Sequence, residues 1–142
     1  MRTHKHDDAA AIEWGLKAIA LAEQLGARES YIQALNLVGV ARWHRGDSGG
    51  RAQLERCLVL GREAGIHSAV GLAYVNLVSI GGELHQFDVA EKYVDAGIRW
   101  CDEHDLDHYG QATMAGVGRL LWRRLTRSPT TRTPPLTRES SP

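Results

Sequence analysis

Apolar residues recur along the chain at the three- and four-residue spacing that places them on one face of a helix, and no stretch alternates as a strand does. Short polar or glycine-containing stretches interrupt this pattern, with Gly26 and Gly65 placed where helices commonly end. The pattern predicts an all-α fold of about six antiparallel helices, over residues 9–25, 28–45, 51–64, 67–84, 89–104 and from about 107 onward.

The predicted first helix is apolar over an unusually wide arc. Trp14, Ala18, Leu21 and Leu25 form one stripe along it, and a second apolar stripe lies beside the first. An arc of this width predicts a helix packed on two sides. Aspartates suited to N-capping precede this helix and the one over residues 89–104: Asp7 or Asp8, and Asp88.

A tripeptide returns at a fixed distance along the chain. Asn36-Leu37-Val38 recurs 40 residues later as Asn76-Leu77-Val78. Without a strand pattern, a period of this length is typical of stacked helical hairpins, which form a curved solenoid. The same register superposes the glutamates and the large apolar residues: Glu23, Glu63 and Glu103; Trp14, Leu54 and Val94.

The composition divides the chain into three parts. Of 142 residues 43% are hydrophobic and the formal net charge is zero, which suits one folded domain. The charge is uneven, because residues 119–142 hold six arginines and one glutamate. We expect a flexible N-terminus over residues 1–8, a helical repeat domain over residues 9–125, and a disordered tail rich in Pro, Thr and Arg over residues 126–142.

No residue pattern indicates catalysis or metal binding. His104 and His108 have the spacing of helical zinc ligands, with Asp105 and Asp107 beside them. Such a site needs a third ligand and a continuous helix, and the histidine pair lies across a predicted turn. A phosphate-binding loop ending in Gly-Lys and a serine in a nucleophile elbow are both missing. We therefore expect a non-enzymatic protein with no cofactor and no metal.

The cysteines and the apolar runs bear on where the protein resides. Cys57 and Cys101 fall on predicted apolar faces, so we expect buried thiols rather than a disulfide. No apolar run reaches the length of a membrane span, and none follows the basic start as a secretion signal would. These features predict a cytoplasmic protein that has no membrane partner.

Several segments resemble the tetratricopeptide-like arrays of large bacterial ATP-binding regulators of the LuxR type: Ile19-Ala20-Leu21-Ala22-Glu23-Gln24-Leu25-Gly26, Ala34-Leu35-Asn36-Leu37-Val38-Gly39, residues 54–65, Tyr74-Val75-Asn76-Leu77 and residues 101–106. The resemblance covers roughly residues 9–122 and implies a tetratricopeptide-like α-α superhelix. In such regulators the array would transmit partner or ligand binding to an ATPase module and a DNA-binding helix-turn-helix. Neither module is present in this sequence, and the period of 40 exceeds the usual length of about 34.

The resemblance also yields an expectation about the ends of the array. The sequence opens on what aligns as the second helix of a hairpin and closes on a first helix, without polar capping helices. We expect a section of a longer array, with a shifted reading frame from about Trp122 onward. Uncapped apolar ends would also favour self-association.

Asn36, Asn76 and Trp43 are the candidate residues of a partner-binding groove, since the first helices of hairpins face the concave side in such arrays. The alternative is structural: asparagines between packed helices mostly satisfy backbone groups, and tryptophans mostly fill cores or seams. The sequence leaves both interpretations open.

The sequence thus favours a non-catalytic protein-interaction or scaffold module with a protein or peptide partner. The alternative is a small nucleic-acid-associated regulator that uses the arginine-rich tail, in which Arg119, Arg123 and Arg127 follow helical spacing. A solvated tail explains the same arginines without a partner. We therefore do not expect direct nucleic-acid binding.

Overall fold

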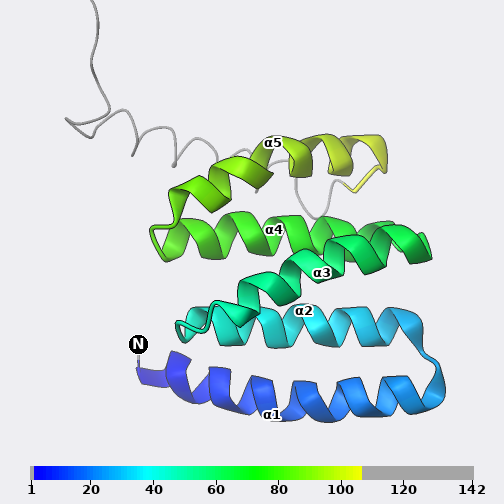
Figure 1. Cartoon of the computed structure of the whole chain (residues 1–142), viewed down its shortest axis with the longest axis vertical. Coiled ribbons are helices and arrows are strands. Elements are labelled where there is room, and N and C mark those ends of the chain that lie inside the picture. Colours follow the sequence, from blue (N-terminus) through cyan, green and yellow to red (C-terminus); the bar gives the residue numbers. More distant parts are fainter. Residues whose placement is uncertain (1, 107–142) are drawn as a thin grey trace, which may run out of the picture.

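The computed structural model describes the backbone of residues 2–106 and the side chains of residues 8–106. Within this part of the chain the fold is all-α, without a strand, and the helices follow one another through tight turns (Figure 1). The elements are α1 (Arg2–Leu25), α2 (Arg28–His44), α3 (Gly49–Ala64), α4 (His67–Glu83) and α5 (Phe87–Glu103). The predicted sixth helix and the predicted tail lie outside the described residues.

The helix ends are set by left-handed residues. Gly26 and Gly65 have φ of 66° and 70°, which confirms the ends predicted for α1 and α3. The predicted N-caps are wrong. Because α1 already begins at Arg2, Asp7 and Asp8 lie inside it, and Asp88 lies in the first turn of α5 after the cap residue Gln86.

A different aspartate supports a helix start. Asp47 Oδ1 accepts a hydrogen bond from the backbone N of Gly49 at 2.8 Å, at the beginning of α3. Its other oxygen, Oδ2, pairs with Arg42 Nε at 2.9 Å. The hydrogen bond from Arg42 lowers the pKa of Asp47, and the one from Gly49 adds to this effect. The α2–α3 turn is therefore tied to the last turn of α2.

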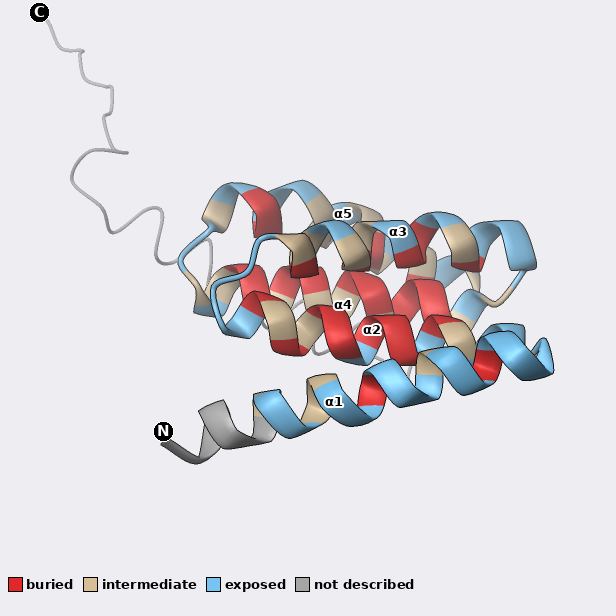
Figure 2. Ribbon diagram, turned by 60° about the horizontal axis from the view of Figure 1, so that its bottom comes forward, coloured by how far each residue is buried: buried red, intermediate tan, exposed pale blue. Residues whose placement is uncertain are grey.

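Consecutive helices pack on each other, and α2 also packs on α4. Figures 1 and 2 show α2 and α4 side by side, with α3 and α5 together on one side of them. In the same views α1 lies along α2 at the edge away from α4. The result is a helical repeat-like fold in which each hairpin contacts mainly its neighbours.

The core lies between the α2–α4 layer and the α3–α5 layer, where Figure 2 shows most of the buried surface. The predicted inward face of α4 is confirmed, since its members are at most 5% exposed: Val70, Ala73, Leu77 and Ile80. Glycines bring α2 and α3 together, because a Cβ at Gly50 would lie 2.4 Å from the carbonyl oxygen of Gly39. Burial of this apolar face holds the hairpins together.

The prediction that α1 packs on two sides is wrong within the described residues. Its contact is with α2, through a face that includes Gly15 and Ala22. The stripe that contains Trp14, Leu21 and Leu25 faces solvent instead, with these residues 65%, 55% and 71% exposed. The pattern identified an apolar face correctly, but it could not show what covers that face.

The turns repeat every 39 residues, so the predicted register of 40 is wrong for the first hairpins. After α1 the N of Ala27 donates to the O of Ala22, and after α3 the N of Ile66 donates to the O of Gly61, both at 2.9 Å. The 39-residue register therefore matches Leu54 with Gly15, whereas the predicted register matched Leu54 with Trp14. After α5 the shift grows to 40, because there the N of Leu106 donates to the O of Cys101.

Candidate functional site

The two asparagines of the repeated tripeptide meet between α2 and α4. Asn36 is fully buried, and its Nδ2 donates to the backbone O of Ala69 at 3.5 Å. Asn76 is partly buried, and its Nδ2 donates to Asn36 Oδ1 at 3.3 Å. These contacts satisfy polar groups inside the helix layer, as the structural interpretation of the pair requires.

Trp43 also belongs to the interior, with 1% of its surface exposed. Because Asn36 and Trp43 are both buried, neither presents its side chain to a partner in this structure. Two of the three candidate residues therefore lie inside the protein, and Asn76 is partly buried.

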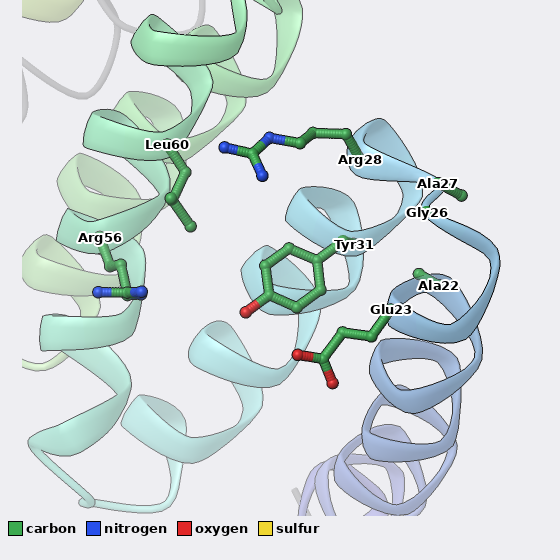
Figure 3. A pocket seen from close by; sticks show the side chains of 8 residues that line it. All are labelled: Ala22, Glu23, Gly26, Ala27, Arg28, Tyr31, Arg56 and Leu60. Carbon is green, nitrogen blue, oxygen red and sulfur yellow. The ribbon is translucent and has the colours of Figure 1, made fainter.

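An open hollow of about 320 Å³ lies elsewhere, between the α1–α2 turn and α3. Figure 3 shows Tyr31 of α2 at its centre, with Leu60 and Arg56 reaching in from α3. Arg28, the first residue of α2, and Glu23 of α1 extend into the hollow from the other side. The lining thus combines apolar side chains, a phenol and three charged groups.

The two arginines of the hollow have no acidic partner within residues 8–106. The ion pairs of this part of the chain involve Arg42, Arg51 and His44, and neither Arg28 nor Arg56 takes part in one. Both arginines are exposed at the rim, where their guanidinium groups remain available for hydrogen bonds and for stacking. With Glu23 opposite, the lining carries a net positive charge.

In the second repeat α3, α4 and α5 take the places that α1, α2 and α3 have in the first repeat. There a side chain of the protein fills the place that corresponds to the hollow. The hydrogen bonds of the turns after α3 and α5 make Gly61 equivalent to Cys101, so Trp100 is the counterpart of Leu60. The turns before α2 and α4 likewise make His67 the counterpart of Arg28. Trp100 Nε1 donates to the O of His67 at 3.0 Å, and the two rings meet edge to face with centroids 5.8 Å apart. A leucine in the first repeat leaves this place open.

A cation covers the indole in the second repeat. The guanidinium carbon of Arg62 lies 5.3 Å from the centre of the Trp100 ring and 5.6 Å from that of Tyr74, whose hydroxyl is hydrogen bonded to Arg62. His104 stacks on the same indole, with ring centres 4.0 Å apart. The second repeat therefore shows how this fold surrounds an aromatic ring at this position.

The exposed apolar stripe of α1 is a second surface that has an equivalent, which lies on α3. The 39-residue register matches Trp14 with Gln53 and Ala18 with Cys57. Both α3 residues contact the preceding helix: Gln53 Nε2 donates to the O of Leu35 at 3.1 Å, and Cys57 Sγ lies 3.7 Å from the O of Ile32. The α1 stripe thus corresponds to a surface that receives a helix in the next repeat.

The cysteines are free and buried, as predicted. Burial raises the pKa of Cys57 to about 12, and it also raises the pKa of Cys101. A thiol kept protonated in this way is a poor nucleophile and a poor metal ligand. Between residues 8 and 106, no three His, Cys, Asp or Glu side chains come together as a metal site would require.

No helix within residues 2–106 combines the length and apolar character needed to cross a membrane. His108 and the arginine-rich segment, on which the metal and nucleic-acid interpretations depended, lie outside the described residues. No family model, curated protein or solved structure matches this chain.

Sequence reasoning missed the hollow. It lies between residues 22–31 and two residues of α3, Arg56 and Leu60, and apolar periodicity reports faces rather than the spaces between them. One signal was present in the 40-residue register, which aligns Leu60 with Trp100 and so exchanges a large aromatic residue for a smaller one.

Proposed function

We propose that the protein is a non-catalytic protein-interaction or scaffold module, built as a tetratricopeptide-like helical repeat of the kind found in LuxR-type ATP-binding regulators. The observation that supports this best is the open hollow between α1, α2 and α3, where Arg28 and Arg56 lie without an ion pair among the described residues. The packing of α2 on α4, with α3 and α5 on one side of them, agrees with a tetratricopeptide-like order of helices.

Affinity capture with the full chain as bait tests this function. The wild type is compared with a double variant, Arg28→Glu and Arg56→Glu, and with Arg99→Glu as a control that exchanges an exposed arginine on α5. We expect specific proteins on the wild type and on Arg99→Glu, with less on the double variant. If the wild type retains nothing beyond a blank column, the interaction function is wrong.

We also propose that a second copy of the chain binds to the stripe of Trp14, Ala18, Leu21 and Leu25 on α1. The counterparts of Trp14 and Ala18 in α3 contact α2, so this part of the stripe is equivalent to a surface that packs on a helix. Its large side chains are more than half exposed. Contiguous exposed apolar surface of this kind marks an association site.

A further inference from the structure

We infer that the hollow between the α1–α2 turn and α3 binds an aromatic side chain of an acidic peptide segment, in the place that Trp100 occupies in the second repeat. This inference rests on the proposed function as an interaction module and names the chemistry of the partner. Three observations support this binding site: Leu60 and Trp100 are structurally equivalent, cations surround the hollow, and these cations have no acidic partner among residues 8–106.

The repeat fixes the position of the aromatic ring. The hydrogen bonds from Ile66 N to Gly61 O and from Leu106 N to Cys101 O define the same turn after α3 and after α5. The residue before each acceptor is therefore equivalent, and these residues are Leu60 and Trp100. In the second repeat the indole rests against the first residue of α4, His67, whose counterpart is Arg28 at the edge of the hollow.

The cations around the hollow suit a ring as well as carboxylates. Arg62 shows that a guanidinium group lies over the Trp100 indole in this fold. Arg28 and Arg56 line the hollow from two helices and can stack on a ring, although the counterpart of Arg62 itself is Glu23 (Figure 3). Their charge, left unpaired by residues 8–106, selects acidic residues beside the ring, on the side away from Glu23.

Tyr31 distinguishes the hollow from its filled counterpart. The 39-residue register pairs Tyr31 with Val70, which packs tightly, since a Cβ at Gly61 would lie 2.6 Å from Val70 Cγ2. In the first repeat the phenol is only partly buried and forms the centre of the hollow. It presents both an aromatic face and a hydroxyl group to an entering side chain.

Calorimetric titration of the full chain with the peptide acetyl-Glu-Asp-Trp-Asp-Glu-amide tests the inference. We expect saturable binding that weakens as the salt concentration rises. Replacing the peptide's tryptophan by alanine, or its acidic residues by lysine, should weaken binding by about tenfold or more, which is about 1.4 kcal/mol. Absence of binding to the wild type at millimolar peptide would overturn the inference.

Two variants of α3 provide a matched pair. Leu60→Trp places the protein's own indole in the hollow and should abolish binding. Val59→Trp is the control, because it adds the same side chain at a neighbouring position that is 52% exposed and lies outside the hollow. Circular dichroism establishes that both variants fold. Equal binding to wild type and Leu60→Trp would overturn the inference.

Reversing the charge of an exposed arginine tests the same binding site without filling the hollow. Arg56→Glu changes an exposed side chain, so the fold should be unaffected, and binding should weaken by about tenfold. Unchanged binding to this variant would overturn the acidic part of the inference. If the peptide fails to bind while the wild-type bait still captures proteins, the interaction function stands and only the chemistry assigned to the hollow is wrong.

Discussion

Asn76 Nδ2 donates a hydrogen bond to Asn36 Oδ1 at 3.3 Å, so the two copies of the repeated tripeptide touch each other between α2 and α4. They do not occupy equivalent places, because the turns repeat every 39 residues and the asparagines are 40 apart. The pair therefore acts as a polar contact across the helix layer. Asn36 is fully buried in that contact.

Asn36→Ala should lower the free energy of unfolding by about 1–3 kcal/mol, because it removes the hydrogen bonds that Asn36 forms inside the helix layer. The groups affected are the O of Ala69 and the side chain of Asn76. Asn76→Ala should cost less, because Asn76 is only partly buried. Urea unfolding measures both variants, and an Asn36→Ala variant as stable as wild type would contradict the structural role.

Gly50→Ala should destabilise the protein by about 1–3 kcal/mol, because the added Cβ would meet backbone rather than a movable side chain. It would lie 2.4 Å from both the O of Gly39 and the N of Trp43, so α2 and α3 would have to separate. Gly49→Ala is the matched control. Its Cβ would lie 2.5 Å from the flexible end of Arg42, which can move aside. Thermal unfolding in which Gly49→Ala proved the more damaging change would contradict this packing.

Stability should fall as the pH rises from about 10 to about 12, in part through Tyr93. Burial raises the pKa of this phenol from 10.0 to about 12, and its hydrogen bond to Glu55 adds to the effect. The folded state therefore holds the proton more tightly than the unfolded state. The resulting stability is present below pH 10 and is lost as the pH rises toward 12.

Tyr93→Phe isolates this contribution. The variant removes the titrating group, so its free energy of unfolding should decline less steeply over the same pH window than that of wild type. Chemical denaturation at several pH values measures the two slopes. Parallel declines for both proteins would show that Tyr93 does not titrate differently on folding.

Self-association should depend on the apolar stripe of α1. Light scattering across a range of concentrations should show a rise in mass for wild type, and a double variant, Leu21→Lys and Leu25→Lys, should remain closer to a monomer. Val59→Lys is a control at another half-exposed apolar position, on α3. A wild type that stays monomeric throughout, or equal loss of association in the control, would contradict this role of α1.

The sequence predicted the helices because their periodicity is local and strong. The buried face of α4, with Val70 and Leu77 fully covered, follows directly from that pattern. The register failed because the matching tripeptides are one residue out of step with the turns, whose hydrogen bonds determine which residues are equivalent. The predicted burial of Trp14 failed because an apolar stripe does not specify its neighbour.

The hollow could not be predicted from periodicity for a related reason. Its walls come from three helices, and the feature that opens it is a difference in side-chain size between Leu60 and Trp100. That difference gains meaning only when the turns show that these two residues are equivalent. The two asparagines among the candidate groove residues were chosen by repetition, which selected a buried contact in Asn36.

The most direct test of the proposed binding site is a methyl nuclear magnetic resonance titration of the full chain with the acidic tryptophan peptide. An indole lying in the hollow should shift the methyl signals of Leu60 upfield through its ring current, in a saturable way. The methyl signals of Leu16 and Leu37, which are 54% and 51% exposed outside the hollow, should stay in place. Equal shifts at all three leucines, or no shift at Leu60, would contradict binding in the hollow.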